Sequence, residues 1–514
     1  MKKFVLQNRR YFPILLILLL ATFLRLYRIS DYMTFLGDEG RDALVWLHMV
    51  RDGKFTLLGP MTSIGNMYLG PLYYYLMLPF FIIFQSPVGP SVGVALFSVL
   101  TVYLLWQFGK EWFNETAGLI TALLYSISPV VISLSRSSWN PNVMPFFALL
   151  TIWGVWQFWQ KRKWIWLPII GISLSFAIQS HYLGLLLIPV VGIFWLVTLR
   201  NIYKDKQILK RFLVFSFALC ALFFALSILP LVWFDLRHNF INFNAFKLFF
   251  TDRQATVNFK IYKAIPNLWP LWETVVTRLL AVKDEFFGKA LSLAIPIMGT
   301  LFIVLRVKSK ARDTRGTFDT FDTSPSLVLL LSWLIIGLVG LGLYKQHIYD
   351  HYFEFIYPAV FLLAGFLISK LFDYGKPLKF LGIGIIIIVC FLNFQDSPLK
   401  YAPNSQLKRV KDVDQLIIQQ TNGKPFNFNL IAKQNYDAGY SYYLEYWYQK
   451  PLTIDAQRFQ ETITDQLFVV CEELPCQPIN NPNAGIANFG WSKIDQKWTV
   501  AGVEIYKLVH NYPK

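Results

Sequence analysis

Long apolar runs separated by short basic loops constrain this chain more than any other feature. Of its 514 residues, 55% are hydrophobic and only 15% are charged. Many of the runs reach the roughly 18 to 20 residues that a helix needs to cross a bilayer. Lipid offers no hydrogen-bond partners to the backbone, so a run that crosses it has to be helical. The sequence therefore predicts an α-helical polytopic membrane protein whose first partner is the lipid bilayer.

The basic loops predict how the chain is oriented. Short loops rich in lysine and arginine mark the cytoplasmic side of a membrane protein. Such loops lie between apolar runs at Gln160–Lys163, Arg200–Arg211, Arg306–Arg315 and Lys370–Lys379. They also account for the basic net charge of +17 without any nucleic acid, so we expect no nucleic-acid partner.

The start of the chain resembles a secretory signal peptide but differs from one in two ways. The basic residues of Met1–Arg10 precede the apolar run Tyr11–Leu26. That run is longer than a typical signal-peptide core, and no small-residue cleavage site follows it. The sequence therefore predicts a retained first transmembrane helix in the plasma membrane, with the N-terminus in the cytoplasm.

Counting outward from these loops predicts about eleven transmembrane helices, given roughly twenty residues for each crossing. One further apolar run, Tyr68–Phe84, would invert all later spans if it crossed. We therefore expect it to lie along the outer interface or to re-enter, because its tyrosines suit the headgroup region. Besides the first helix, we expect the spans near 88–107, 117–134, 143–159, 164–180, 183–199, 211–233, 289–305, 327–343, 353–369 and 380–394.

The residues after the last span are polar and mixed in character. The prolines of the linker Asp396–Gln406 mark a boundary between a transmembrane domain, 1–394, and a soluble domain, 395–514. We predict that the second is a small α+β domain outside the cytoplasm. Its strand-like runs are Phe426–Ile431, Tyr440–Tyr448 and Leu467–Val470.

The four cysteines fall into two groups. Cys220 and Cys390 lie in apolar spans, where we expect them to pack as small hydrophobic residues. Cys471 and Cys476 lie in the C-terminal domain and can close a short disulfide loop if that domain is outside the cytoplasm. A zinc site is less favoured, because His510 is the one histidine nearby in the sequence.

The most informative polar stretch is Gly37-Asp38-Glu39-Gly40 in the first outer loop. Adjacent carboxylates between flexible glycines can take a proton from a hydroxyl group or hold a divalent metal ion. A solvated turn is the alternative for any loop of this kind. We predict catalytic roles for Asp38 and Glu39, and we leave open whether a divalent metal is required.

The other ionisable candidates also gather at the outer edge of the membrane, and almost none lies in mid-span. Secondary transporters, in contrast, place such residues near the midplane. The pattern therefore favours an enzyme that acts on a lipid-attached group from outside. Arginine and lysine suit a phosphate group, and the full set of candidates is Arg25, Arg28, Arg136, His181, Lys345, His347, Asp350 and His351.

Each candidate also has a purely structural interpretation. Arg25 and Arg28 can extend to the interface from the end of the first helix. His181 lies at a tight turn between spans, where a satisfied polar side chain is common. The His347–His351 segment has the residue types of a metal site but not its spacing.

Several motifs along the chain resemble the GT-C membrane glycosyltransferases. The nearest families by pattern are the family 39 protein mannosyltransferases and the bacterial aminoarabinose transferases that modify lipid A. The resemblance covers most of residues 10–370 and does not extend to the C-terminal domain. Its motifs are Leu24-Arg25-Leu26, Gly37-Asp38-Glu39-Gly40, Gly70-Pro71-Leu72-Tyr73-Tyr74-Tyr75-Leu76, Ser135-Arg136 and His351-Tyr352.

The resemblance implies transfer of a hexose or mannose-like sugar from a polyprenyl-phosphate donor to an acceptor hydroxyl, with inversion, outside the membrane. The acceptor would be a glycan, a lipid or a protein. Asp38 matches the catalytic acid of the family, Glu39 its neighbour, and Arg136 a basic residue that contacts the donor phosphate. We group Arg25, Lys345 and His351 with Arg136, and assign His181, His347 and Asp350 to substrate or metal contacts.

Two features depart from these relatives. Ser137–Asn140 stands where the lipid A branch carries an acidic residue, and the loop 235–288 is too short for the domain that the protein mannosyltransferases insert there. A flippase for a lipid-linked sugar is the alternative function, since it would share the phosphate-binding arginines. A non-catalytic assembly subunit is the third, and it would tolerate replacement of Asp38 and Glu39.

Overall fold

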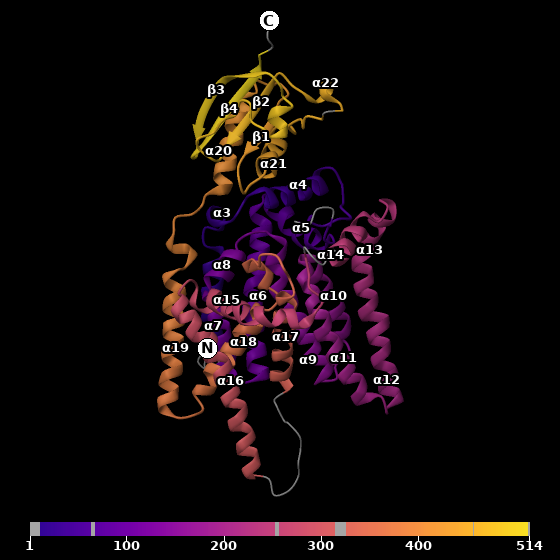
Figure 1. Cartoon of the computed structure of the whole chain (residues 1–514), viewed down its shortest axis with the longest axis vertical. Helices are drawn as coiled ribbons and strands as arrows, with labels where there is room; N and C mark the ends of the chain where they lie inside the picture. The colour runs from indigo at the N-terminus through magenta and orange to yellow at the C-terminus, as the bar shows by residue number, and fades with distance from the viewer. Residues whose placement is uncertain (1–10, 63–66, 252–255, 314–324, 456, 512–514) are drawn as a thin grey trace, which may run out of the picture.

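Helices make up most of the chain, and a four-stranded sheet lies near its C-terminus (Figure 1). The computed structural model describes residues 11–62, 67–251, 256–313, 325–455 and 457–511. The predicted basic start, Met1–Arg10, lies outside the described residues, and so does the end of the predicted loop Arg306–Arg315.

The helices before residue 396 form a bundle with shorter helices at one end (Figure 1). They are α2 (Phe12–Leu26), α3 (Ile29–Tyr32), α4 (Gly37–Arg51), α5 (Leu72–Phe84), α6 (Val88–Trp112), α7 (Glu115–Ile127), α8 (Pro129–Leu134), α9 (Met144–Trp159), α10 (Trp166–Ser180), α11 (Leu187–Ile202), α12 (Lys206–Leu213), α13 (Leu222–Arg237), α14 (Ile241–Thr251), α15 (Ile265–Val276), α16 (Glu285–Asp313), α17 (Pro325–Gly342), α18 (Tyr357–Leu371) and α19 (Lys376–Gln395).

Six helices are long and apolar enough to cross a membrane among the residues that the structure describes. Other predicted spans form shorter apolar helices, among them α2, α7, α10 and α18. The chain is therefore a polytopic helical membrane protein, as predicted, although several helices are shorter than expected. The six run over Val88–Trp112, Tyr182–Ile202, Lys206–Arg237, Glu285–Phe302, Pro325–Gly342 and Lys376–Gln395.

Small residues bring the central helices α6, α7 and α18 close together. A Cβ added at Gly109 of α6 would lie 2.6 Å from the Cα of Gly118 in α7, and one added at Gly365 of α18 would overlap Thr121 of α7. Helices in a membrane gain little from the hydrophobic effect, so close backbone packing supplies much of their association. These three helices therefore form a fixed centre for the bundle.

The prediction of one continuous span over 117–134 is wrong. α7 ends at Ile127, Ser128 is extended, and α8 begins at Pro129. Proline lacks the N–H group that would continue a helix and is favoured at the first position of a new one. The Ser128 hydroxyl donates a hydrogen bond to the carbonyl oxygen of Leu279 at 3.0 Å, which helps to hold the break.

The run Tyr68–Phe84 contains α5, which has 13 residues. A helix of that length covers about 20 Å, less than the roughly 30 Å of a hydrocarbon core. After a turn at Gln85 the chain folds back, so that Phe80 of α5 lies against Gly93 of α6. The short length agrees with the expectation that this run does not cross the membrane by itself.

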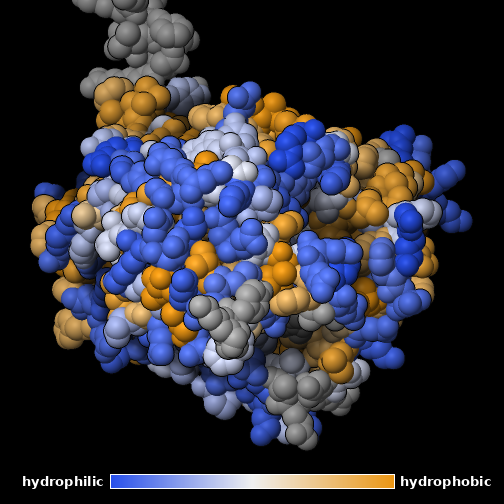
Figure 2. Space-filling model, turned by 90° about the horizontal axis from the view of Figure 1, so that it is seen from above, coloured by the Kyte–Doolittle hydropathy of each residue, from blue (hydrophilic) through white to orange (hydrophobic). Residues whose placement is uncertain are grey.

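The C-terminal region adds a mixed sheet with the strand order β1-β2-β4-β3. β1 and β2 are parallel, and the other two pairs are antiparallel. The region lies beyond α3 and α4 in Figure 1, and the surface at that end is mostly hydrophilic in Figure 2. Its elements are α20 (Gln406–Gln420), β1 (Asn427–Ile431), α21 (Ala438–Trp447), α22 (Phe459–Thr462), β2 (Gln466–Cys471), α23 (Ala484–Ala487), β3 (Ser492–Val500) and β4 (Val503–His510).

Two of the three predicted strands are correct, and one is wrong. β1 falls within its predicted run and β2 includes the whole of its own, whereas the run Tyr440–Tyr448 forms most of the helix α21. Its tyrosines favour a strand by composition, but α21 is buried between α4 and α20 and its tyrosines serve both contacts. The α+β class is as predicted, and the domain boundary between residues 394 and 395 stays a prediction.

Candidate active site at the start of α4

Asp38 lies in the first turn of α4 and is the exposed carboxylate of a small acidic cluster. Its Oδ1 accepts hydrogen bonds from Arg41 Nη1 and from the Tyr436 hydroxyl, each at 2.8 Å. The Asp38 side chain is 41% exposed, so it is held in place yet open to a substrate. The helix dipole also favours a negative charge at this end of α4.

Glu39 points into the protein. It is 5% exposed, and its Oε2 accepts a hydrogen bond from the backbone N–H of Leu36 at 3.1 Å. Burial raises the pKa of Glu39 to about 7, because the charged carboxylate loses its water. Glu39 therefore fixes the start of α4, and it does not face a substrate as a catalytic role would require.

Asp42 is a third carboxylate, which sequence reasoning missed. It is fully buried, and its Oδ1 accepts hydrogen bonds from Arg41 Nη2 and from the Tyr74 hydroxyl, each at 2.8 Å. Burial raises the pKa of Asp42 to about 6. The signal in the sequence was the spacing, because residues 38 and 42 lie four apart on one face of a helix.

A turn before α18 brings two histidines together close to this cluster. The rings of His181 and His351 lie 5.8 Å apart, and Trp139 lies 4.5 Å from His351. Burial lowers the pKa of His351 to about 4, although the charges on Asp350 and Asp38 act in the opposite direction. Burial also lowers the pKa of His181 to about 3. Both imidazoles are therefore neutral at pH 7.

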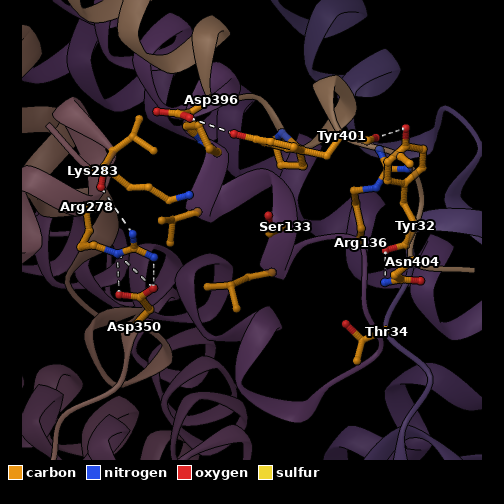
Figure 3. Close-up of a pocket in the computed structure, with 16 residues that line it drawn as sticks. Tyr32, Thr34, Ser133, Arg136, Arg278, Lys283, Asp350, Asp396, Tyr401 and Asn404 are labelled. Carbon is orange, nitrogen blue, oxygen red and sulfur yellow. Dashed lines mark hydrogen bonds and ion pairs between the residues drawn. The ribbon is translucent and has the colours of Figure 1, made fainter. Parts of the chain in front are cut away.

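A cavity of about 420 Å³ lies beside the same turn. Figure 3 shows Arg278 and Lys283 on one side of it, and Arg136 with Tyr32 on the other. Thr34 lines it from the loop that leads to Asp38. The cavity is thus lined by three cationic side chains and by two carboxylates, Asp350 and Asp396, and Asp38 is not among its lining residues.

Arg278 and Lys283 were not among the predicted site residues. Arg278 Nε donates a hydrogen bond to Asp350 Oδ1 at 3.0 Å, and this contact raises the pKa of Arg278. Lys283 is exposed and has no ion-pair partner among the described residues. Both lie in the stretch 235–288, which has no recognisable motif. Their position shortly after the apolar helix α15 was the one signal in the sequence that could have indicated them. Asp350, predicted as a substrate or metal contact, is thus occupied by Arg278.

Arg136, predicted to contact the donor phosphate, lines the cavity, but part of its guanidinium is already engaged. Nη1 and Nη2 donate to the carbonyl oxygens of Leu24 and Tyr27 at 2.7 and 2.6 Å. Its Nε has no hydrogen-bond partner among the described residues. Burial lowers the pKa of Arg136 to about 10, so it is still charged at pH 7. That nitrogen is buried, so Arg136 contributes its positive charge beside the cavity rather than an exposed N–H group.

Arg25 lies inside the bundle. Its Nε donates to Ser98 Oγ at 2.8 Å, and its Nη1 donates to the carbonyl oxygen of Ser126 at 3.0 Å. The side chain is fully buried, so Arg25 ties α2 to α6 and α7. A charge inside a bundle has to be satisfied in this way. The predicted contact of Arg25 with a donor phosphate is therefore not supported by its position.

Lys345 and His347 lie away from the cation-lined cavity. Lys345 lines a second cavity of about 410 Å³ together with Lys263 and Asn267. The His347 ring is exposed and lies 4.5 Å from that of Tyr349. Of the predicted phosphate-binding group, the structure brings Arg136 and His351 to the site and places Arg25 and Lys345 elsewhere.

The carboxylates of α4 do not form a metal site. Among the residues that the structure describes, no group of three or more His, Cys, Asp or Glu side chains is placed to hold a metal ion. Arg41 lies between Asp38 and Asp42, and Glu39 turns inward. These residues do not fit a divalent metal, and we derive no chemical step through one.

The two cysteines of the C-terminal region form a disulfide. Cys471 ends β2, and its partner is Cys476. Cys220 and Cys390 are free thiols, as expected for packing residues. A disulfide is typical of an oxidising compartment, which agrees with a C-terminal region outside the cytoplasm.

Comparison of the sequence with known proteins gives one family. Residues 69–231 match the family described as dolichyl-phosphate-mannose-protein mannosyltransferase. The matched stretch begins before α5 and ends in α13, so it includes Arg136 and His181 but not Asp38. None of the curated proteins matches the chain in sequence.

Comparison of the structure covers nearly the whole chain. ArnT from Cupriavidus metallidurans, bound to undecaprenyl phosphate, has a TM-score of 0.61 at 13% identity, over 96% of this chain and 97% of that one. The archaeal oligosaccharyltransferase AglB from Archaeoglobus fulgidus, in complex with an inhibitory peptide and a dolichol-phosphate, has a TM-score of 0.50 at 15% identity, over 91% and 70%. At such identities the likeness shows the fold. The chain therefore has the fold of the GT-C membrane glycosyltransferases, which confirms the resemblance seen in its sequence.

Proposed function

We propose that this protein is a glycosyltransferase that moves a sugar from a polyprenyl-phosphate donor to an acceptor hydroxyl on the outer face of the plasma membrane. The observation that carries the proposal is Asp38, a held but exposed carboxylate at the start of α4, four residues after Thr34, which lines a cavity with three cations. A solved structure of the same fold contains undecaprenyl phosphate. The matching family is described by a dolichyl-phosphate-mannose donor, which favours a hexose of the mannose type.

The reaction needs a group that accepts the proton of the acceptor hydroxyl. In the proposed step, the hydroxyl oxygen forms a bond to the anomeric carbon of the sugar while the bond from that carbon to the phosphate oxygen breaks. Asp38 takes the hydroxyl proton, and the electron pair of the broken bond leaves with the polyprenyl phosphate. Attack opposite the phosphate inverts the anomeric carbon. A positioned base of this kind contributes about 10²- to 10⁴-fold to the rate.

The departing phosphate gains a negative charge during this step. Lys283 is exposed on one side of the cavity, the buried Arg136 lies on the other, and Arg278, paired with Asp350, adds a third cation. Fixed cations that face the place where charge develops stabilise a transition state more than mobile water does. We therefore assign the cavity to the donor phosphate, with His351 as a neutral hydrogen-bonding group between it and Asp38.

The test is a transfer assay in proteoliposomes with a radiolabelled polyprenyl-phosphate hexose. Asp38→Asn should lose about 10²- to 10⁴-fold in rate, because an amide cannot accept the proton. Asp31→Asn is the matched control, since Asp31 is an exposed carboxylate in the same loop that pairs with Arg28. Asp31→Asn should transfer sugar at the wild-type rate.

Three results would contradict the proposal. Transfer by Asp38→Asn at the wild-type rate would remove Asp38 from the mechanism. Movement of the labelled lipid across the membrane without any glycosidic product would support the flippase instead. A wild-type protein that neither transfers nor moves the lipid would favour the non-catalytic subunit.

A further inference from the structure

We infer that the C-terminal region supplies a positioning residue, Tyr436, to the reactive carboxylate Asp38. The inference rests on the proposed function, because it assigns Tyr436 a role in the transfer step. Tyr436 lies 398 residues after Asp38 in the sequence, yet its hydroxyl donates a hydrogen bond to Asp38 Oδ1 at 2.8 Å. No motif of the resemblance reaches this part of the chain.

The ring of Tyr436 is fitted to the start of α4. A Cβ added at Gly37 would overlap the Tyr436 ring, so the glycine makes room for the tyrosine. The neighbouring Asn435 accepts a hydrogen bond from the backbone N–H of Gly37 at 2.9 Å through its Oδ1. Two successive residues of the C-terminal region thus contact the first two residues of α4.

The loop that carries Tyr436 is itself held. Asn435 Nδ2 donates to Glu472 Oε1 at 3.0 Å, and the Tyr440 hydroxyl donates to the same oxygen at 2.8 Å. Glu472 follows the buried strand β2 directly. The position of the Tyr436 hydroxyl is therefore set by the sheet and not by the loop alone.

A second contact between the C-terminal region and α4 lies further along that helix. Glu445 of α21 accepts a hydrogen bond from Arg51 at 2.6 Å and lies 2.8 Å from Nε2 of His48. Together with Tyr436 these contacts span α4 from its first turn to its last. The C-terminal region cannot shift relative to Asp38 without breaking both.

The hydrogen bonds leave one oxygen of Asp38 for chemistry. Arg41 and Tyr436 both donate to Oδ1, and no described residue donates to Oδ2. Two hydrogen bonds to one oxygen fix the orientation of the carboxylate. Oδ2 is then free to accept the proton of the acceptor hydroxyl in a defined direction, which is what a positioned base requires.

The experiment compares wild type with Tyr436→Phe, which keeps the ring against Gly37 and removes only the hydroxyl. Tyr506→Phe is the matched control, because the Tyr506 hydroxyl also donates to a carboxylate of the C-terminal region, that of Glu504, at 2.6 Å. The measurements are kcat, the KM for the lipid donor, the dependence of kcat on pH, and the thermal midpoint of each protein.

We expect Tyr436→Phe to lower kcat about tenfold or more, because a hydrogen bond to a charged group is being lost. The KM for the donor should stay unchanged, since the phosphate cavity is untouched. Tyr506→Phe should change none of these values.

Other outcomes distinguish a failure of the inference about Tyr436 from a failure of the proposed function. If the wild type transfers sugar and Tyr436→Phe keeps the wild-type kcat and pH profile, the inference is wrong while the proposed function stands. A lower thermal midpoint with unchanged kcat and pH profile would reduce Tyr436 to a docking residue and also overturn the inference. If the wild type transfers no sugar, the proposed function fails and the inference fails with it.

Discussion

Arg41 is shared by two carboxylates of α4, and a third lies in the same turn. It contacts both the exposed Asp38 and the buried Asp42, while Glu39 contacts the backbone of Leu36. One positive charge cannot neutralise three negative ones in a buried setting. Protons must therefore neutralise part of this cluster, and the affected residues are the buried ones.

The first prediction concerns pH and Glu39. Its pKa is about 7 in the folded protein against an ordinary value of 4.5, so the folded state binds the proton more tightly. The contribution of Glu39 to folding stability should therefore fall as the pH rises from about 4.5 through about 7, by at most about 3 kcal/mol. The buried His181 and His351, whose pKa values are lowered, shift the stability in the opposite direction below about pH 6.5. The measurement is the thermal midpoint in detergent between pH 5 and pH 8.

Glu39→Gln is the variant that isolates this effect. Its amide oxygen can still accept from the Leu36 N–H, but it no longer titrates. In this variant, the fall in stability with pH that comes from the buried carboxylates should be shallower. What remains of it comes from the smaller contribution of Asp42, whose pKa is about 6. Asp31→Asn, which alters an exposed carboxylate, should keep the wild-type slope. An unchanged slope in Glu39→Gln would show that Glu39 is ionised in the folded protein.

At the residue scale, the sequence predicted the types of side chain better than their surroundings. Asp38 is exposed as a base should be, whereas its neighbour Glu39 is buried. Arg136 lies at the cavity, whereas Arg25 lies inside the bundle. Adjacent residues on a helix point about 100° apart, so a motif of two acids cannot present both to one substrate. Tyr436 could not be found from the sequence at all, because its contact with α4 depends on the complete fold.

At the scale of elements, the contact between α4 and α21 depends on one glycine. A Cβ added at Gly40 would overlap the backbone of Gly439, whereas a Cβ added at Gly439 would have its nearest neighbour at 3.5 Å, an ordinary contact. Gly40 is therefore required for the approach of the two helices, and Gly439 is not. The two glycines face the same interface and form a natural pair for mutation.

The second prediction is that Gly40→Ala separates the two helices. Forcing a side chain into a filled contact costs about 1 to 3 kcal/mol, so the thermal midpoint and the transfer rate should both fall. Gly439→Ala should be neutral or slightly stabilising, because alanine favours a helix more than glycine does. Equal behaviour of the two variants would mean that the helices are not in close contact at this point.

The elements that the sequence predicted well are those with a long uniform pattern. The apolar runs of α6 and α19 became long helices, whereas the run over 117–134 is broken at Pro129. The tyrosine-rich run of α21 has no clear period, and its neighbours in space made it a helix. Local composition determines an element only where tertiary packing does not compete with it.

At the scale of the whole molecule, the third prediction concerns the orientation of the protein in the membrane. The basic loops and the disulfide both favour a C-terminal region outside the cytoplasm. A cysteine introduced at the exposed Asp495 of β3 should react with a membrane-impermeant thiol reagent in intact cells. One introduced at the exposed Lys376, the first residue of α19, should react only after the membrane is opened.

The wild-type protein is the control for this labelling. Its free thiols, Cys220 and Cys390, lie in helical segments of the bundle, and its other two cysteines are joined to each other. Labelling of Lys376→Cys in intact cells, with protection of Asp495→Cys, would reverse the orientation and place Asp38 on the cytoplasmic side.

The hydrogen bond between Asp38 and Tyr436 also has a consequence for biosynthesis. Asp38 enters the membrane region early, while Tyr436 is made almost 400 residues later and belongs to the part of the chain that follows the last span. During synthesis, the carboxylate therefore waits without its partner until the final segment has been made and folded. If Asp38 is the base of the proposed reaction, a half-made chain in the membrane would hold this carboxylate without the hydrogen bond that positions it.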